Sequence, residues 1–308
     1  MRSSDSSVVT RSIISVPKYF SFWRTVYSHG WCSLPPFLVD KERYELKRLL
    51  RLAGGVLVHC TLRESPSGIS VRSESRQSLT TPQRSEVRAQ LRSCFRLDED
   101  LTGFFAVVNN DRRLRWIRSS GSGRLLRAPT VFEDLLKMMC TTNCTWGLTE
   151  VMVTNLTTKL GEEFPTGVYS FPTPSKLASC TEAFMRKEIR SGYRSPYLVE
   201  FGERVASGKL DVESWRGSML PTEELFKEVC SIKGIGEYAA GNLLRLLGRY
   251  DYLALDSWVR AKYAELYHGG RKVSDRTIER TYQKHGSWRG LIFWFEMTKD
   301  WLNQKFPF

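Results

Sequence analysis

The feature that most constrains the fold of this chain is a pair of glycines between two amphipathic helical patterns. Residues 232–236 are Ile-Lys-Gly-Ile-Gly. One apolar helical face precedes them after a start signal at Pro221, and a second follows them and ends at Gly248, a residue type common at helix C-termini. Two glycines around one aliphatic residue predict a tight hairpin over about residues 222–248, with Ile235 packed between the helices.

The charge of the chain indicates a polyanionic partner. Lys and Arg number 46, Asp and Glu number 33, and the net charge is +13. This surplus suits nucleic acid or an anionic membrane surface. No apolar stretch is as long as a membrane span, and no basic amphipathic helix stands apart from the rest. We therefore expect nucleic acid and no membrane; a merely basic soluble protein is the alternative.

The hairpin has the chemistry to hold phosphate. Gly234 and Gly236 leave backbone N–H groups exposed at the start of a helix, where the helix dipole favours an anion. Lys233 adds a cation beside Ile235. Such a loop contacts DNA phosphate without distinguishing the bases. The alternative is a purely structural turn, since any tight helix–helix connection can use two glycines.

The seven cysteines predict neither a disulfide framework nor a metal centre. They are scattered and contain no CxxC pair, and no zinc or iron–sulfur spacing occurs. Cys140 and Cys144 lie four apart on an expected helix, where we interpret them as small buried side chains. We expect no required cofactor and no iron–sulfur cluster.

The hydrophobic periodicity along the chain predicts an α+β fold in two parts. Residues 1–16 are rich in Ser and Arg and are expected to form a mobile tail. Residues 17–128 predict an antiparallel β-rich N-terminal domain, and residues 129–308 predict an all-α domain that carries the hairpin.

Individual elements follow from local patterns. Alternation at 56–62 and 69–71 predicts a β-hairpin, residues 82–95 predict a helix, and the apolar run 104–108 predicts a strand before a turn. Spacings of three and four predict further helices at 132–139, 151–160, 175–179, 182–189, 197–207, 222–230 and 287–297.

Asp256 is the candidate for chemistry. It follows a short apolar stretch and precedes a helical pattern, so its structural interpretation is a helix N-cap. Near a phosphate-holding hairpin, a carboxylate can instead stabilise a sugar cation or orient an attacking water, as carboxylates do in glycoside hydrolysis.

Four stretches together carry a family resemblance. Ile232–Gly236 followed by Leu255-Asp256, with Met139–Asn143 and Gly192–Tyr197, resembles the helix-hairpin-helix DNA glycosylase superfamily, especially its 8-oxoguanine and 3-methyladenine branches. The β-rich part is similar to the N-terminal domain of those branches, so the resemblance covers most of the chain from about Tyr19.

The resemblance implies roles for three residues in duplex DNA. A base must leave the stack before it can react, and the gap must be filled. Asn143 would fill that gap, Tyr193 would wedge the duplex, and Arg194 would donate to a base or a phosphate. The structural alternatives are a helix-surface amide for Asn143 and an ordinary packed aromatic for Tyr193.

The resemblance also predicts a monofunctional enzyme. Members that nick the strand carry a lysine nucleophile two residues after the last glycine of the hairpin. Tyr238 occupies that position here, and Lys233 lies before the hairpin. Water would be the nucleophile, Asp256 the stabiliser or base, and an abasic site the product. A non-catalytic DNA-binding module and a glycosylase/lyase with a displaced lysine are the alternatives.

The base pocket is expected to use the C-terminal helix and the β-rich part. Phe293, Trp294 and Met297 are the expected lining on the helix, and Trp31 the expected lining from the β-rich part. This apolar set makes 8-oxoguanine specificity doubtful and suits an alkylated purine or a bulky modified cytosine, as in phage DNA.

By the same resemblance, the backbone carbonyls of Cys230, Ile232 and Ile235 would bind a monovalent cation at the hairpin. We expect a monomer that acts on double-stranded DNA, in the cytoplasm (nucleoid) of a bacterium or the nucleus of a eukaryote.

Overall fold

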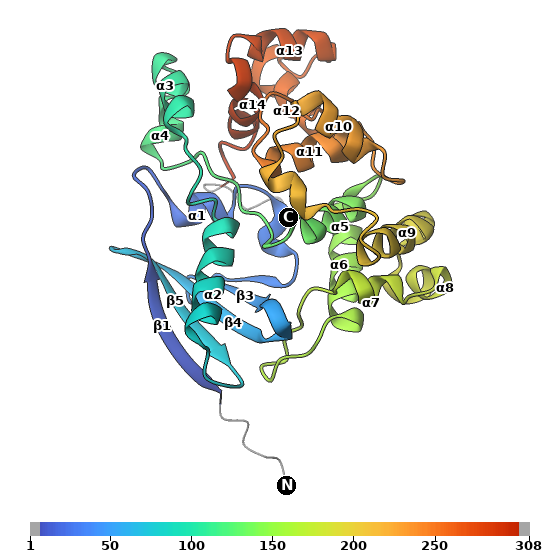
Figure 1. Ribbon diagram of the computed structural model, residues 1–308. Coiled ribbons are helices and arrows are strands. Elements are labelled where there is room, and N and C mark those ends of the chain that lie inside the picture. Colours follow the sequence, from blue (N-terminus) through green and yellow to red (C-terminus); the bar gives the residue numbers. More distant parts are fainter. Residues whose placement is uncertain (1–6, 302–308) are drawn as a thin grey trace.

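The computed structural model describes residues 7–301. Its N-terminal part is a five-stranded antiparallel sheet with strand order β1-β5-β4-β3-β2, and helices build the rest of the molecule (Figure 1). The strands are β1 (Val8–Ile14), β2 (Phe37–Asp40), β3 (Glu45–Arg51), β4 (Leu57–Ser65) and β5 (Gly68–Ser75). The predicted α+β class is confirmed.

The predicted β-hairpin is confirmed as β4 and β5, which pair from Val58 with Ser75 to Ser65 with Gly68. The helix predicted at 82–95 is α2 (Thr81–Cys94). Thr80 caps its start, in a capping box with Gln83.

The prediction of a mobile tail over residues 1–16 is wrong for the part that the structure describes, and residues 1–6 lie outside it. Residues 8–14 form β1, the edge strand, which pairs with β5 from Val8 opposite Ser75 to Ile14 opposite Ile69. Only Ile14 of this strand is buried. An edge strand with one buried side chain has no regular apolar alternation, and its stability comes largely from backbone pairing with β5.

The strand predicted at 104–108 is also wrong, because this run lies in helix α3 (Thr102–Asn110). Phe104 and Val108, four residues apart, are the buried residues of its inner face. The Phe104 ring lies 5.6 Å from the ring of Trp288, near the C-terminal helix. A short apolar run fits a buried helix as well as a strand, and here tertiary packing selects the helix.

The helical part contains the helices predicted from spacing. Beyond α1 (Phe22–Val26), α2, α3 and α4 (Arg115–Ser119), the helices are α5 (Val131–Thr141), α6 (Trp146–Leu160), α7 (Pro174–Ala178), α8 (Glu182–Phe184), α9 (Ser195–Ala206), α10 (Thr222–Cys230), α11 (Glu237–Leu247), α12 (Ser257–His268), α13 (Asp275–Gln283) and α14 (Arg289–Met297). Single turns complete the chain, including the 3₁₀ turn η1 (Gly30–Ser33), the π turn η3 (Met185–Ile189) and the 3₁₀ turn η4 (Gly192–Arg194). Within residues 7–301, none of these helices combines the length and apolar character needed to cross a bilayer.

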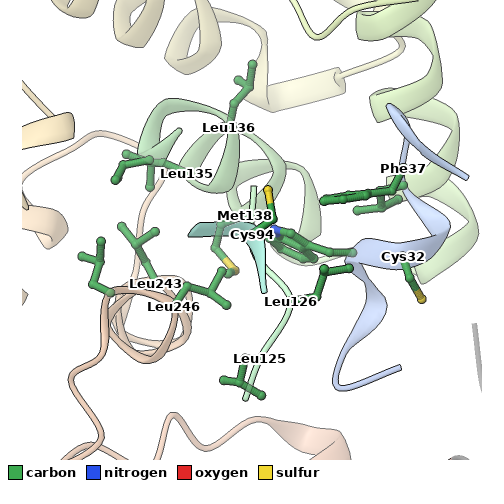
Figure 2. Packing of buried hydrophobic residues seen from close by; sticks show 14 of the residues in the cluster. Cys32, Phe37, Cys94, Leu125, Leu126, Leu135, Leu136, Met138, Leu243 and Leu246 are labelled. Carbon is green, nitrogen blue, oxygen red and sulfur yellow. The ribbon is translucent and has the colours of Figure 1, made fainter. Parts of the chain in front are cut away.

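One hydrophobic core runs through both parts of the chain, across the boundary expected near residue 129. Figure 2 shows side chains from three regions meeting in it: Phe37 from β2, Met138 from α5 and Leu246 from α11. The sheet, α5 and the hairpin helices therefore form one packed body, which makes a site built from all three possible.

A buried ion network ties the sheet to α5. Glu133 of α5 accepts from Arg48 of β3 at 2.7 Å and pairs with Lys137 at 2.7 Å, and all three side chains are at most 3% exposed. Burial alone would raise the pKa of the Glu133 carboxyl, but the two cations reverse this and hold the pKa at about 2.

Replacing Glu133 with Ala should destabilise the fold strongly, because Arg48 and Lys137 would lose the carboxylate that neutralises them. We expect the free energy of unfolding in denaturant to fall by about 3–5 kcal/mol. The matched control is Glu182→Ala, which removes the exposed helical pair with Arg186 and should cost less than about 1 kcal/mol. Similar small losses in both variants would show that the buried network is dispensable.

Candidate active site

A cavity of about 630 Å³ lies between η1, the α5–α6 connection, α11, the start of α12 and α14. Its walls include five tryptophans: Trp31, Trp146, Trp258, Trp294 and Trp301. Its polar lining includes Tyr238, Asn242, Arg245 and Asp256. A concave space with aromatic walls and a few polar groups is the usual form of a small-molecule site, and this volume is within the usual range.

The chain leading to Asp256 is held between two helices at glycines. A Cβ on Gly241 of α11 would lie 2.5 Å from the Tyr252 ring, and a Cβ on Gly290 of α14 would lie 2.1 Å from the Tyr252 carbonyl oxygen. The Gly290 N–H donates to the Tyr250 carbonyl at 2.6 Å. Only glycine allows both helices to approach this segment so closely, one against the Tyr252 ring and the other against its backbone, and the approach determines the position of Asp256.

Asp256 caps α12 and lines the cavity. Its Oδ1 accepts the Val259 N–H at 2.7 Å, which confirms the N-cap interpretation. The residue is partly exposed and also lies on the cavity wall, so capping and a role in chemistry are compatible.

Tyr238 lies beside Asp256 in the cavity. Burial raises the pKa of its hydroxyl well above the usual range, and the nearby Asp256 carboxylate raises it further. The phenol therefore keeps its proton at neutral pH. It can donate a hydrogen bond to Asp256, but it does not act as a phenolate nucleophile.

The predicted hairpin is confirmed between α10 and α11. Gly234 has φ of +86°, and Ile235 is buried with its N–H donating to the Ile232 carbonyl at 3.0 Å. Gly236 is the N-cap of α11, so the backbone N–H groups after it are at the positive end of the helix dipole. Lys233 is exposed and pairs with Glu200 at 2.8 Å.

The carbonyls of Cys230, Ile232 and Ile235 belong to this same turn. The Ile232 oxygen has a second lone pair besides the one that accepts the Ile235 N–H. Carbonyl oxygens are donors that hard cations accept, so the set fits a monovalent ion, which stays a prediction. Among residues 7–301 there is no cluster of three or more His, Cys, Asp or Glu side chains suited to a metal.

Asn143 and Tyr193 lie together in the structure. Asn143 is in the connection after α5 with φ of +47°, not on a helix surface, and it lines the cavity. Its Nδ2 donates to the Tyr193 hydroxyl at 3.3 Å, and Tyr193 is 47% exposed. The two side chains therefore stand at the edge of the cavity on an accessible surface.

The predicted role of Arg194 as a donor to DNA is wrong for this structure. Arg194 is 4% exposed. Its Nε donates to the Thr142 hydroxyl at 3.3 Å, a second nitrogen donates to the Thr142 carbonyl, and its guanidinium lies 4.6 Å from the centre of the Tyr193 ring. It holds the turn before Asn143 against Tyr193, and it does not line the cavity.

Two of the four predicted pocket residues are placed wrongly. Trp31 and Trp294 line the cavity, whereas Phe293 and Met297 are at most 1% exposed in the core and do not line it. Phe293 packs edge-on against Tyr282 at 5.0 Å. Phe293 and Met297 are four residues apart and share the face of α14 that packs into the core, whereas Trp294, the next residue, faces the cavity.

Trp31 is held in the cavity wall by a buried acid. Its indole N–H donates to Asp134 of α5 at 2.7 Å, and the same oxygen accepts the Ala128 N–H at 2.8 Å. Burial raises the pKa of Asp134 to about 6, although Arg216 opposes this shift. The wall thus depends on a contact between the β-rich part and α5.

Asn242 and Arg245 also belong to the cavity lining, although their sequence pattern was not recognised as part of a site. With Tyr238 they occupy positions i, i+4 and i+7 of α11, and all three line the cavity. Three polar residues that share one face of a helix otherwise rich in Ala and Leu are a pattern that could have predicted this polar cavity wall.

Replacing Gly234 with Ala should destabilise the hairpin. The position has positive φ, and a Cβ would lie 2.8 Å from the Tyr197 ring, so we expect unfolding to become easier by about 2–4 kcal/mol. Gly236→Ala is the matched control, because nothing lies within 4 Å of its Cβ position, and it should cost less than about 1 kcal/mol. Equal losses in chemical denaturation would contradict this account of the turn.

Comparisons with known proteins agree with this geometry. No protein-family model matches the chain. A relative named probable N-glycosylase/DNA lyase, from Methanothermobacter thermautotrophicus, is 25% identical over 246 residues, which are 69% of this chain and 75% of the relative.

Solved structures match over nearly the whole chain. The 3-methyladenine DNA glycosylase of Archaeoglobus fulgidus superposes with a TM-score of 0.75 at 18% identity, covering 95% of this chain and 99% of its own. The apo 8-oxoguanine glycosylase/lyase of Clostridium acetobutylicum superposes with a TM-score of 0.68 at 20% identity, covering 95% and 97%. The chain therefore has the fold of these two glycosylases, and the sequence relative that it resembles is named as one too.

Proposed function

We propose that this protein is a monofunctional DNA glycosylase. It hydrolyses the N-glycosidic bond of a damaged or modified base that has flipped out of duplex DNA, and it leaves an abasic site. The observation that carries the proposal is the placement of the Asp256 carboxylate on the wall of an aromatic cavity of about 630 Å³. A flipped base can stack within such a cavity while its sugar lies near the carboxylate.

The chemistry follows from the charge at Asp256. As the bond to the base breaks, positive charge develops on the sugar, and a fixed carboxylate stabilises it. Asp256 is held by the Val259 N–H at 2.7 Å and has the Tyr238 hydroxyl nearby, so it needs little reorganisation during the reaction. A water that attacks the sugar completes the hydrolysis, with Asp256 able to orient it.

The lining of the cavity supports hydrolysis rather than strand cleavage. A lyase step needs an amine that attacks the sugar and forms a Schiff base. Among residues 7–301, no lysine lines the cavity, and Tyr238 occupies the hairpin-helix position where the family resemblance places the lysine of strand-nicking members. A protonated phenol cannot form a Schiff base.

DNA binding follows from the hairpin and the edge of the cavity. The backbone N–H groups at the start of α11 can hold one phosphate. Asn143 and Tyr193, joined at 3.3 Å, stand where they can fill the gap left by the base. The clostridial glycosylase named above has also been solved with double-stranded DNA, and that complex superposes on this chain with a TM-score of 0.63 at 20% identity over 88% of this chain and 99% of its own.

Asp256→Asn should abolish base release. Duplexes that each carry one modified base would be incubated in single turnover, and the free base measured by chromatography. We expect a loss of roughly 10²-fold or more in the rate, because the neutral amide cannot stabilise the sugar cation. Asn is also a good N-cap, so the melting temperature should hardly change.

The matched control is Asp98→Asn, in a surface ion pair with Arg92, neither residue of which lines the cavity. It should release base at close to the wild-type rate. Equal rates for Asp256→Asn and wild type would refute the role of Asp256. Tight duplex binding without release from any substrate would favour a non-catalytic DNA-binding protein.

A further inference from the structure

The inner wall of the cavity carries a buried cation. Among the described residues that line it, the side chains charged at neutral pH are Arg245, Asp256 and Arg260. Arg260 is bound to Asp275 at 2.7 Å and Asp256 is partly exposed, whereas Arg245 is only 3% exposed. His29 adds no charge, since burial lowers its pKa to about 3. Arg245 is thus the charge that a bound base meets in the driest part of the cavity.

The Arg245 guanidinium has donors to spare. One nitrogen donates to the Leu253 carbonyl at 2.9 Å and another to the Asn242 amide oxygen at 3.0 Å. Its Nε is buried without a hydrogen-bond partner. Each terminal nitrogen also carries a second hydrogen that these two bonds do not use, and a ligand in the cavity that brings an acceptor can bind it.

The ring of Trp294 already makes a contact with the Arg245 cation. The guanidinium of Arg245 lies 4.5 Å from the centre of the Trp294 ring, within the range of a cation–π contact. Trp294 is fixed there by the bond from its indole N–H to the Ser28 carbonyl at 2.8 Å. The protein's own cation therefore takes the attraction that this ring would offer to a cationic base, and it repels a second positive charge.

We propose that Arg245 selects the base by charge: the cavity takes a neutral base that presents an oxygen or nitrogen acceptor, and it rejects a base that carries a positive charge. The inference rests on the proposed function, since it names the substrate class of the same cavity. It separates the two substrates that the sequence left open. Purines alkylated at N3 or N7 are cations in DNA and are rejected, whereas a cytosine modified at C5 is neutral and keeps acceptors.

The test uses two free purines that differ by one methyl group and one charge. These are 9-methylguanine, which is neutral, and its N7-methylated cation, 7,9-dimethylguaninium, at pH 6. Binding to the full chain would be followed by the indole N–H resonances of the tryptophans. We expect the wild type to bind the neutral purine at least tenfold more tightly.

Two variants distinguish charge from shape. Arg245→Met keeps the length of the side chain without its charge, and it should bind the two purines about equally or prefer the cation. Arg245→Lys keeps the charge and should keep the preference for the neutral purine, even if Arg245→Met proves too unstable to measure. Melting temperatures of both variants would be recorded alongside.

The outcomes separate this inference from the proposed function. Equal affinities in the wild type, tighter binding of the cation, no binding of either purine, or a preference that Arg245→Met retains would each overturn the role of Arg245. None of these depends on catalysis. Conversely, a charge preference that behaves as expected, in a protein that releases no base from any duplex, would support the selective cavity and count against the glycosylase.

Discussion

The close approach of α11 and α14 to the chain between Tyr250 and Leu255 determines the geometry of the whole site. Helix α11 meets that segment at Gly241, where a Cβ would lie 2.5 Å from the Tyr252 ring, and α14 meets it at Gly290, where a Cβ would lie 2.1 Å from the Tyr252 carbonyl oxygen. Arg289 of α14 also donates to the Asp251 carbonyl at 2.6 Å. These contacts fix the segment so that Asp256 lies at the start of α12, next to the residues of α11 that line the cavity. The catalytic candidate, the hairpin and the cavity floor are therefore parts of one packed unit.

Charge is distributed within that unit in a way that suits cleavage of a glycosidic bond. The partly exposed Asp256 carboxylate can face the sugar, where positive charge develops, while the buried Arg245 lies on the same cavity wall. Burial lowers the pKa of Arg245 to about 10, which still leaves it charged at neutral pH. A cation near the departing base stabilises the negative charge that develops on the base as the bond breaks. Selection and chemistry thus make use of the same pair of opposite charges.

Local signals made the hairpin and Asp256 predictable, because glycine spacing, helix starts and N-caps are encoded within a few residues. The cavity walls depend on how separate helices rotate against each other, which periodicity leaves open. Phe293 and Met297 were therefore assigned to the pocket although they face the core, and Arg245 was missed although it lines it. Arg194 shows the same limit, since its motif predicts a basic side chain but not its burial against Thr142. The strand at residues 8–14 was not predicted because it is stabilised by pairing with β5, which lies more than fifty residues away in the sequence.

Mass spectrometry of the DNA product tests the central claim most directly. A duplex with a modified base that the protein releases would be incubated with wild-type protein, quenched without alkali, and the modified strand weighed intact. The account predicts a full-length strand with an abasic site, because Tyr238 offers no amine for strand cleavage. Two shorter strands, one ending in an unsaturated aldehyde, would contradict it and would identify the chain as a glycosylase/lyase.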